Sequence, residues 1–289
     1  MTTRTRLGPR AFLKASGFLT DAKPARMDAA LLKALDPGNR QRIEGIWANR
    51  NLALSDGLEM YEVPQTVEQA ALLFSHDWPR AAATMDWFDG VVRDARARSV
   101  AEMGCGAGFL LAYLKSGDPG LAVRGIDAAA NLGAIAARLT GGEIAVGDYT
   151  FHAPAAQSDL VICDFGFDLA SFAPSVRPHD VSTVGGELFC RNCSDDLAEQ
   201  LRGLFLAWRA WGTAEASLAL SGRLGNFGSL RAVLIAARTS GWEMRLERSR
   251  ILKVRTVLGE QERFPAILFV PAASARAVTE EELAIFFGS

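Results

Sequence analysis

Glu102-Met103-Gly104-Cys105-Gly106-Ala107-Gly108 is the stretch of sequence that decides the fold. The short run Ser99-Val100-Ala101 precedes it, and the apolar run Phe109-Leu110-Leu111-Ala112-Tyr113-Leu114 follows it. This order predicts a strand, a glycine turn and a helix. Glycines allow positive φ and a close approach of the backbone to a ligand, and the first turn of a helix presents unpaired N–H groups. The stretch therefore predicts a ligand site at the end of the strand.

Glu102 distinguishes between two kinds of nucleoside cofactor. A dinucleotide turn receives a pyrophosphate, which a carboxylate in the same crevice repels, whereas a cofactor that carries an ammonium and a sulfonium is attracted by it. The G-x-G-x-x-G pattern of nicotinamide-binding proteins is also incomplete, because Phe109 stands where the third glycine is needed. Both observations favour the cationic cofactor.

Composition sets broad limits on the class of protein. A chain of 289 residues is long enough for one large or two small domains with a substantial core. Its formal net charge of −2 gives no electrostatic case for a nucleic acid or an acidic membrane as partner. No apolar run approaches the roughly 18 residues that a membrane span requires. The basic N-terminus contains only the short patch Ala11-Phe12-Leu13, which is no signal-peptide core, so we expect a cytoplasmic protein.

Four cysteines stand at positions 105, 163, 190 and 193. Cys190-Arg191-Asn192-Cys193 is a C-x-x-C, but no second pair completes a four-thiolate zinc site. So few cysteines do not predict a disulfide framework in a chain of this size. We therefore expect no metal, while a Cys/Cys/His site that includes His179 stays open as an alternative.

Helices dominate the first third of the chain, and strands alternate with helices after it. Apolar positions at helical spacing, such as Ile43, Ile46 and Trp47, indicate the helices. The nearly uninterrupted apolar run at 159–164 indicates a strand buried on both faces, as in a parallel sheet. The expected helices are 28–35, 41–54, 66–75, 81–97, 108–115, 128–139, 195–211, 229–240 and 280–287, and the expected strands are 99–103, 122–127, 143–146, 159–164, 215–221, 243–254 and 264–271.

This alternation predicts an α/β fold with a doubly wound, mostly parallel seven-stranded sheet, a C-terminal β-hairpin and an N-terminal helical cap. Ligands of such sheets bind beyond the carboxyl ends of the strands, near the switch in strand order. Motifs at strand ends are therefore the places to look for function.

Four motifs in order, each at the C-terminal end of an expected strand, carry a resemblance to a known family. Over roughly residues 80–272 the chain resembles the class I S-adenosylmethionine-dependent methyltransferases. The resemblance implies S-adenosylmethionine as cofactor and S-adenosylhomocysteine as product. The four motifs are Glu102 with Gly104, Gly106 and Gly108, then Arg124-Gly125-Ile126-Asp127, Gly147-Asp148-Tyr149 and Ile162-Cys163-Asp164-Phe165.

The expected organisation follows from this resemblance. Residues 1–26 form a flexible N-terminus, and residues 27–97 form a helical cap on the acceptor side. Residues 98–272 form the methyltransferase domain that binds S-adenosylmethionine, with residues 166–194 as an irregular insertion or lid. Residues 273–289 form a tail with a short helix.

The resemblance assigns the first motif to the methionine portion of the cofactor. Gly104, Cys105 and Gly106 carry the backbone beneath it, and Gly108 closes the turn. Glu102 meets the amino group, directly or through water. On the residues alone, the glycines are also compatible with a tight turn between strand and helix that binds nothing.

The later motifs are assigned to the nucleoside and to the methyl group. Asp127 accepts both ribose hydroxyls with its two oxygens, and Ala128 lies near the adenine face. Asp148 accepts the exocyclic amine of adenine with Tyr149 beside it, and Asp164 lines the opening toward the acceptor. Plainer alternatives remain open, namely a solvated turn residue for Asp148, a packing residue for Tyr149 and a capping residue for Asp164.

Methyl transfer from a sulfonium is an in-line displacement, so alignment of the nucleophile supplies much of the catalysis and a general base is optional. The candidate catalytic residues are Asp164, His179 and His76. Either histidine has the chemistry to take a proton from an amine or a hydroxyl. His152 is expected on the outer surface.

The acceptor is expected to be a small molecule or metabolite with an oxygen or nitrogen nucleophile. Cys163-Asp164-Phe165-Gly166 lacks the Asp-Pro-Pro-Tyr or Asn-Pro-Pro-Tyr sequence of enzymes that methylate amino groups of flipped bases. Two alternatives stay open: a methyltransferase acting on a peptide, a protein or tRNA, and a catalytically silent subunit that keeps the fold for binding. The chain is expected to be a monomer or a homodimer.

Overall fold

The computed structural model describes residues 6–48, 57–167 and 172–289. Within these ranges the strands are β1 (Ser99–Met103), β2 (Ala122–Asp127), β3 (Glu143–Val146), β4 (Ser158–Asp164), β5 (Val181–Val184), β6 (Glu187–Cys190), β7 (Gly212–Ser221), β8 (Trp242–Met244), β9 (Arg250–Arg255) and β10 (Gln261–Pro271). The main sheet has the order β3-β2-β1-β4-β7-β10-β8, and β9 pairs with β10. β5 and β6 form a separate hairpin.

Helices occupy most of the remaining described residues. The helices are α1 (Pro9–Ala15), α2 (Pro24–Ala34), α3 (Pro37–Ala48), α4 (Gly57–Tyr61), α5 (Val67–Leu73), α6 (Trp78–Ala95), α7 (Phe109–Gly117), α8 (Ala130–Thr140), α9 (Arg191–Trp211), α10 (Phe227–Thr239) and α11 (Glu280–Gly288), with 3-10 turns η2 (Phe74–Asp77), η3 (Leu246–Arg248) and η4 (Ala272–Ser274). No helix among the described residues combines the length and the apolar character that a membrane crossing demands.

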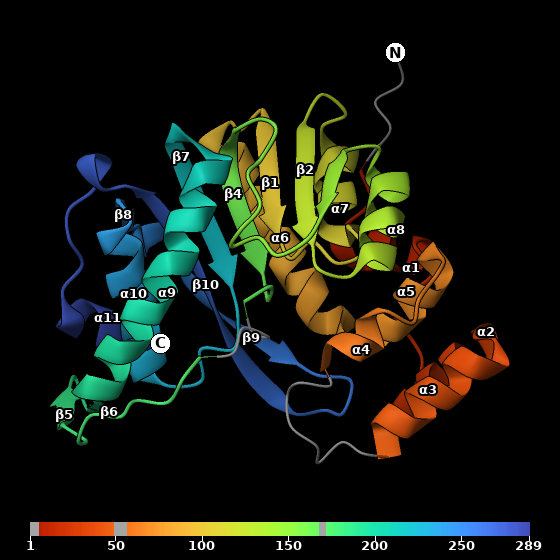
Figure 1. The fold of residues 1–289 in the computed structure, drawn as a ribbon, viewed down its shortest axis with the longest axis horizontal. Helices are drawn as coiled ribbons and strands as arrows, with labels where there is room; N and C mark the ends of the chain where they lie inside the picture. The colour runs from red at the N-terminus through yellow and green to blue at the C-terminus, as the bar shows by residue number, and fades with distance from the viewer. Residues whose placement is uncertain (1–5, 49–56, 168–171) are drawn as a thin grey trace. The chain divides into compact units, whose positions relative to one another are not determined.

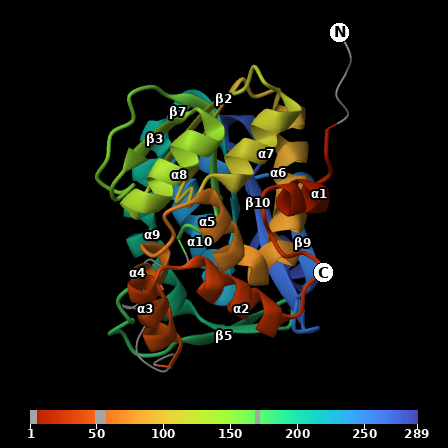
Figure 2. The same ribbon diagram turned by 90° about the vertical axis from the view of Figure 1, so that its right-hand side faces the viewer.

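The chain divides into two compact units, each described by itself. Unit 1 comprises Met1–Gly90, Gly104–Asp148 and Val254–Glu262. In it β2 and β3 pair in parallel, and α7 and α8 lie beside these strands (Figure 2). Helix α1 packs on α7, where the ring of Phe12 meets that of Tyr113 edge-on at 5.3 Å.

Unit 2 comprises Val91–Met103, Tyr149–Lys253 and Arg263–Ser289. Its strands β1, β4 and β7 are parallel, and β10 runs antiparallel to β7 and β8. Helices α9 and α10 pack against each other and against this part of the sheet (Figure 1). The buried side chains of Phe205, Trp208, Trp242 and Phe269 fill the core beneath them. The strands β1 and β4 thus belong to a well-packed part of unit 2.

The mostly parallel sheet with antiparallel strands at the C-terminal end confirms the expected fold class. The expected strand 243–254 is wrong in detail, because η3 separates β8 from β9. The Ser249 hydroxyl donates to the Arg245 carbonyl at 2.9 Å and accepts the Leu268 amide at 3.1 Å. A side chain therefore replaces the strand ladder at this point, and the sheet gains a further strand.

The structure also differs from the expected flexible N-terminus. Residues 9–15 form α1, and the side chain of Leu13 is fully buried. Arg6 pairs with Asp89 and places its guanidinium 3.9 Å from the centre of the Tyr113 ring. These contacts hold the segment to unit 1. The end of the expected helix 41–54 lies outside the described residues, since α3 ends at Ala48.

The expected irregular insertion at 166–194 contains the hairpin β5–β6 and the start of α9. Gly185 and Gly186 have φ of 57° and 89°, the positive values that a two-residue hairpin turn requires at both positions. Helix α9 begins at Arg191 rather than at the expected residue 195, because the Cys190 sulfur accepts the Cys193 amide at 3.3 Å and caps the helix. The insertion is therefore structured next to its cysteines.

Candidate functional site

The glycine turn after β1 contains three positions whose backbone conformation only glycine adopts without strain. Gly104, Gly106 and Gly108 have φ of 71°, 52° and 76°. A Cβ on Gly108 would lie 2.8 Å from the Cβ of Ala136 in α8, whereas a Cβ on Gly106 would meet no atom within 4 Å. Gly108 is therefore needed for helix packing, and Gly106 leaves open space above the turn.

Two backbone bonds attach this turn to the end of β2. The amides of Gly104 and Cys105 both donate to the Ile126 carbonyl, at 2.9 and 3.0 Å. The buried Cys105 side chain packs against the backbone of Gly125, where a Cβ would stand 2.9 Å from its sulfur. Gly125 is therefore part of the site's construction, and Cys105 offers only its backbone to a ligand.

Asp127, at the end of β2, receives the turn with its side chain. One carboxylate oxygen accepts the Gly106 amide at 2.7 Å, and the other accepts the Ala129 amide at 2.9 Å. Burial raises the pKa of Asp127, and the hydrogen bonds from Ala129 and Gly106 offset only part of that effect. Since a carboxylate has about four lone-pair sites, each oxygen keeps capacity for one more donor.

The remaining residues expected at the cofactor lie at the ends of strands. Glu102 is buried in β1, two residues before Gly104. Ala128 and Asp148 are exposed, the former directly after β2 and the latter after β3. The Gly147 amide donates to the Asp127 carbonyl at 2.9 Å, so the turn that carries Asp148 is joined to the end of β2.

In unit 2 the end of β4 carries a strained residue that the sequence does not reveal. Phe165, directly after Asp164, has φ of 63°, a value that costs a non-glycine residue about 1–2 kcal/mol. Its amide donates to the Ser221 carbonyl at 2.8 Å, and its ring packs edge-on against Phe264. Such strain persists where the surroundings fix it, and it gathers at ligand sites.

Tyr149 is anchored at both ends of its side chain. Its hydroxyl donates to the Gly166 carbonyl at 2.9 Å, and its ring lies edge-on to Trp208 with 5.8 Å between centroids. Tyr149 thus fixes the segment that follows Asp164. These contacts support the alternative that Tyr149 is a packing residue. The face of its ring is the part that can contact a nucleobase.

The structure gives each histidine a partner. The Nε2 atom of His76 lies 2.7 Å from an Asp28 carboxylate oxygen. His152 is exposed and stacks on Trp211 at 6.1 Å. His179 lies with Cys190 and Cys193, and its Nδ1 is 3.4 and 3.3 Å from their sulfurs. The partner of His76 is therefore an acid, that of His152 an indole ring, and those of His179 two thiols.

Comparisons with known proteins agree with this architecture. No model of a protein family matches the sequence, and no curated protein matches it. Among solved structures, the chain is similar to the N-methyltransferase NodS from Bradyrhizobium japonicum WM9, in complex with S-adenosyl-L-homocysteine. The match has a TM-score of 0.50 and 12% sequence identity, and it covers 76% of this chain and 98% of NodS.

A second similar structure is the magnesium protoporphyrin IX methyltransferase ChlM from Synechocystis PCC 6803, solved with bound SAM. That match has a TM-score of 0.44 and 14% identity, and it covers 67% of this chain and 82% of ChlM. The strand order, the glycine turn and the match to NodS define the fold. The chain has the class I S-adenosylmethionine-dependent methyltransferase fold.

Proposed function

We propose that the protein is an S-adenosylmethionine-dependent methyltransferase with a small-molecule oxygen or nitrogen nucleophile as acceptor. The observation that carries the proposal is the Asp127 carboxylate, which holds the Gly106 amide and keeps lone pairs for two hydroxyls. The half-buried Asp127 thus lies beside the open space above Gly106 with acceptor capacity to spare.

The residues of the glycine turn and of β2 fit the parts of this cofactor. Gly104 to Gly108 present backbone without side chains, and Asp127 presents two acceptors to vicinal ribose hydroxyls. Exposed Ala128 and Asp148 are assigned to the adenine face and its amine, and Glu102 to the ammonium group. When bound, the cofactor supplies an activated methyl group on sulfur.

The chain's own part in the reaction is to orient the acceptor and exclude water. Asp164 is our candidate for the polar group near the transferred methyl, and its backbone is fixed by the bond from Phe165 to β7. His76 and His179 are retained as weaker candidates for proton acceptance. The net charge of −2 supports a small acceptor over a nucleic acid.

Titration calorimetry with S-adenosylmethionine and S-adenosylhomocysteine tests the proposal. Asp127→Ala is expected to weaken binding by about 1.5–3 kcal/mol, or roughly 10- to 150-fold in Kd, since it removes charged hydrogen bonds. Asp118→Ala is the matched control. Like Asp127, the Asp118 carboxylate accepts the backbone amide two residues further along, that of Gly120, at 2.9 Å, but it lies before β2 and away from the end that carries the motif. Absence of binding up to millimolar cofactor contradicts an active enzyme and favours the silent subunit.

A further inference from the structure

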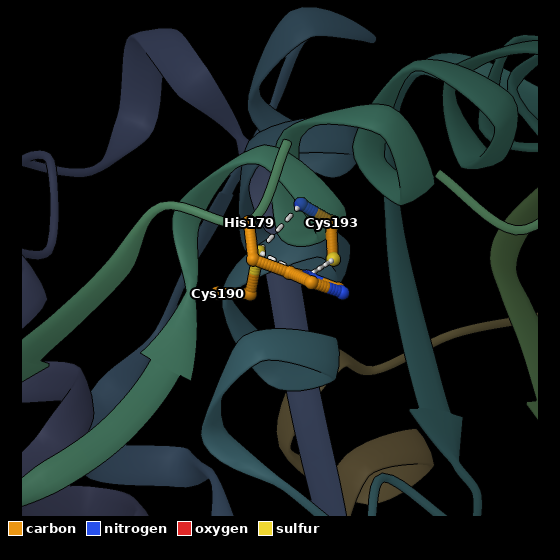
Figure 3. A group of neighbouring side chains, drawn as sticks. All are labelled: His179, Cys190 and Cys193. Atoms are coloured by element: carbon orange, nitrogen blue, oxygen red, sulfur yellow. Dashed lines mark hydrogen bonds between the residues drawn. The ribbon is translucent and has the colours of Figure 1, made fainter. Parts of the chain in front are cut away.

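Three side chains that ordinarily bind soft metal ions converge where β6 ends and α9 begins. The ligand atoms of His179, Cys190 and Cys193 all lie within 4.8 Å of one another. Figure 3 shows the three side chains together, with dashed lines from the imidazole to the sulfurs. We propose that these residues form a binding site for a thiophilic divalent cation, zinc in particular.

The distances suit a tetrahedral centre. With metal–sulfur bonds of about 2.3 Å and a metal–nitrogen bond of about 2.0–2.1 Å, nitrogen and sulfur ligands lie roughly 3.5 Å apart. The observed separations from His179 Nδ1 are 3.4 Å to the Cys190 sulfur and 3.3 Å to the Cys193 sulfur. Only small side-chain movements are needed to place an ion between the three atoms.

The segment that carries His179 is held in place without the ion. The Asn192 side chain donates to the Pro178 carbonyl at 2.7 Å, and the Arg191 amide donates to the Asp180 carbonyl, also at 2.7 Å. Arg177 forms an ion pair with Asp196. These contacts flank His179 on both sides and tie it to the first turns of α9, so the site is preorganised.

A second set of contacts lies one helical turn beyond Asp196 in α9. The Gln200 side chain accepts the Ala173 amide at 2.7 Å and donates to the Ala173 carbonyl at 3.0 Å. The segment that precedes His179 is therefore already attached to α9 at Ala173. A disulfide between Cys190 and Cys193 requires no such histidine, which is why we favour the metal.

Metal binding at this site releases protons. Each thiol loses its proton to solvent and binds as thiolate, and His179 binds through Nδ1 in the tautomer that carries hydrogen on Nε2. A metal-bound His179 therefore no longer serves as a proton acceptor in methyl transfer. Three protein ligands leave a fourth position for water or another donor, because His179 is exposed and both cysteines are only half-buried. The bound ion would then link the segment before β5 to the start of α9.

This inference does not depend on methyl transfer, so its test uses metal binding itself. Tag-free, phosphine-reduced protein is titrated with zinc against a chromophoric chelator and with cobalt under anaerobic conditions. We expect one zinc per chain, and with cobalt we expect thiolate charge-transfer absorption together with the visible bands of a tetrahedral site. Zinc is also expected to raise the melting temperature, because it binds the folded chain preferentially.

Single variants Cys190→Ser, Cys193→Ser and His179→Ala are each expected to weaken zinc binding by at least about tenfold, since even outer-sphere partners cost 10- to 100-fold. His152→Ala, which removes another exposed histidine, is the control and keeps full affinity. Cys105 and Cys163 are buried and do not compete.

Two results overturn the proposal. One is zinc binding that is equal in the wild type and in a variant that combines Cys190→Ser, Cys193→Ser and His179→Ala, which reveals an adventitious ion only. The other is a Cys190–Cys193 disulfide that forms in air and reforms after reduction even with excess zinc, detected by mass after alkylation. Both are read on folded protein, as checked by circular dichroism.

Discussion

The Asp127 carboxylate accepts the Gly106 amide at 2.7 Å, and this bond joins the end of β2 to the glycine turn after β1. The same side chain accepts the Ala129 amide and so also shapes the entry to α8. A charge that is partly removed from water, as in half-buried Asp127, costs free energy unless it is hydrogen-bonded. The two amides meet that cost only in part, because the pKa of Asp127 remains raised.

A pH dependence of cofactor binding follows from that raised pKa. The folded chain takes up the Asp127 proton at a higher pH than the unfolded chain, so protonation stabilises the fold as the pH falls through the raised pKa. The same protonation removes an acceptor that we assign to ribose. We therefore expect cofactor affinity to decrease as the pH falls through the raised pKa of Asp127, which lies above the ordinary aspartate pKa of about 3.9.

Calorimetry across this pH range checks the expectation, with Asp127→Asn as the comparison. The variant has no titrating group at this position, so its affinity is expected to be lower and flatter with pH. Parallel curves for the wild type and the variant would assign the pH dependence to another acid.

A pair of glycine variants separates folding from binding. Gly108→Ala places a methyl group 2.8 Å from the Ala136 Cβ at positive φ, so we expect a loss of about 2–4 kcal/mol in the free energy of unfolding. Gly106→Ala meets no atom within 4 Å, so only the backbone cost of about 1–2 kcal/mol is expected.

Urea unfolding and cofactor titration measure the two effects. Gly106→Ala is expected to weaken cofactor binding although it is the more stable variant, because its methyl group fills the space above the turn. A Gly106→Ala protein with wild-type affinity would show that no ligand approaches the turn at this residue.

The strands that carry the cofactor motifs could be predicted from the sequence because local signals determine them. The bounds of β1, β2 and β3 coincide with the expected 99–103, 122–127 and 143–146, since each strand is a short, largely apolar stretch that ends at an acid or just before a glycine. The hairpin β5–β6 was missed, although apolar and β-branched residues flank the turn signal Gly185-Gly186, because the nearby Pro174 and Pro178 favour an irregular segment.

Other features depend on contacts between distant residues, which spacing does not encode. The positive φ of Phe165 is imposed by the bond to Ser221 and by the ring of Phe264, a hundred residues further along the chain. The meeting of His179 with Cys190 and Cys193 likewise depends on how the segment before β5 lies along α9. From the sequence, these histidine and cysteine positions could be stated only as an open alternative.

Tyr149→Phe tests which part of this side chain serves the cofactor. The variant loses the hydrogen bond to the Gly166 carbonyl, and we expect a loss of about 1 kcal/mol in the free energy of unfolding. The cofactor Kd is expected to stay unchanged, because the assigned contact with adenine uses the ring. A weaker Kd with unchanged stability would instead assign the hydroxyl to the cofactor.

Arg231→Lys is expected to loosen the C-terminal helix. The Arg231 guanidinium is nearly buried, and it donates to Glu280 at 2.6 Å, to Asp195 at 2.5 Å and to Ser194 at 3.1 Å. A lysine ammonium lacks the planar fork that spans these partners, so we expect a loss of about 1–3 kcal/mol, limited by the partly exposed acids. Hydrogen exchange is expected to accelerate in α11 before it does in α10.

Arg276→Lys is the matched control for this prediction. Arg276 also pairs with an acid in the first turn of α11, Glu282, but its side chain is 69% exposed. An exposed pair contributes only about 0–1 kcal/mol, so this variant is expected to unfold like the wild type. Equal losses in the two variants would mean that burial of the Arg231 guanidinium does not determine how α11 is held.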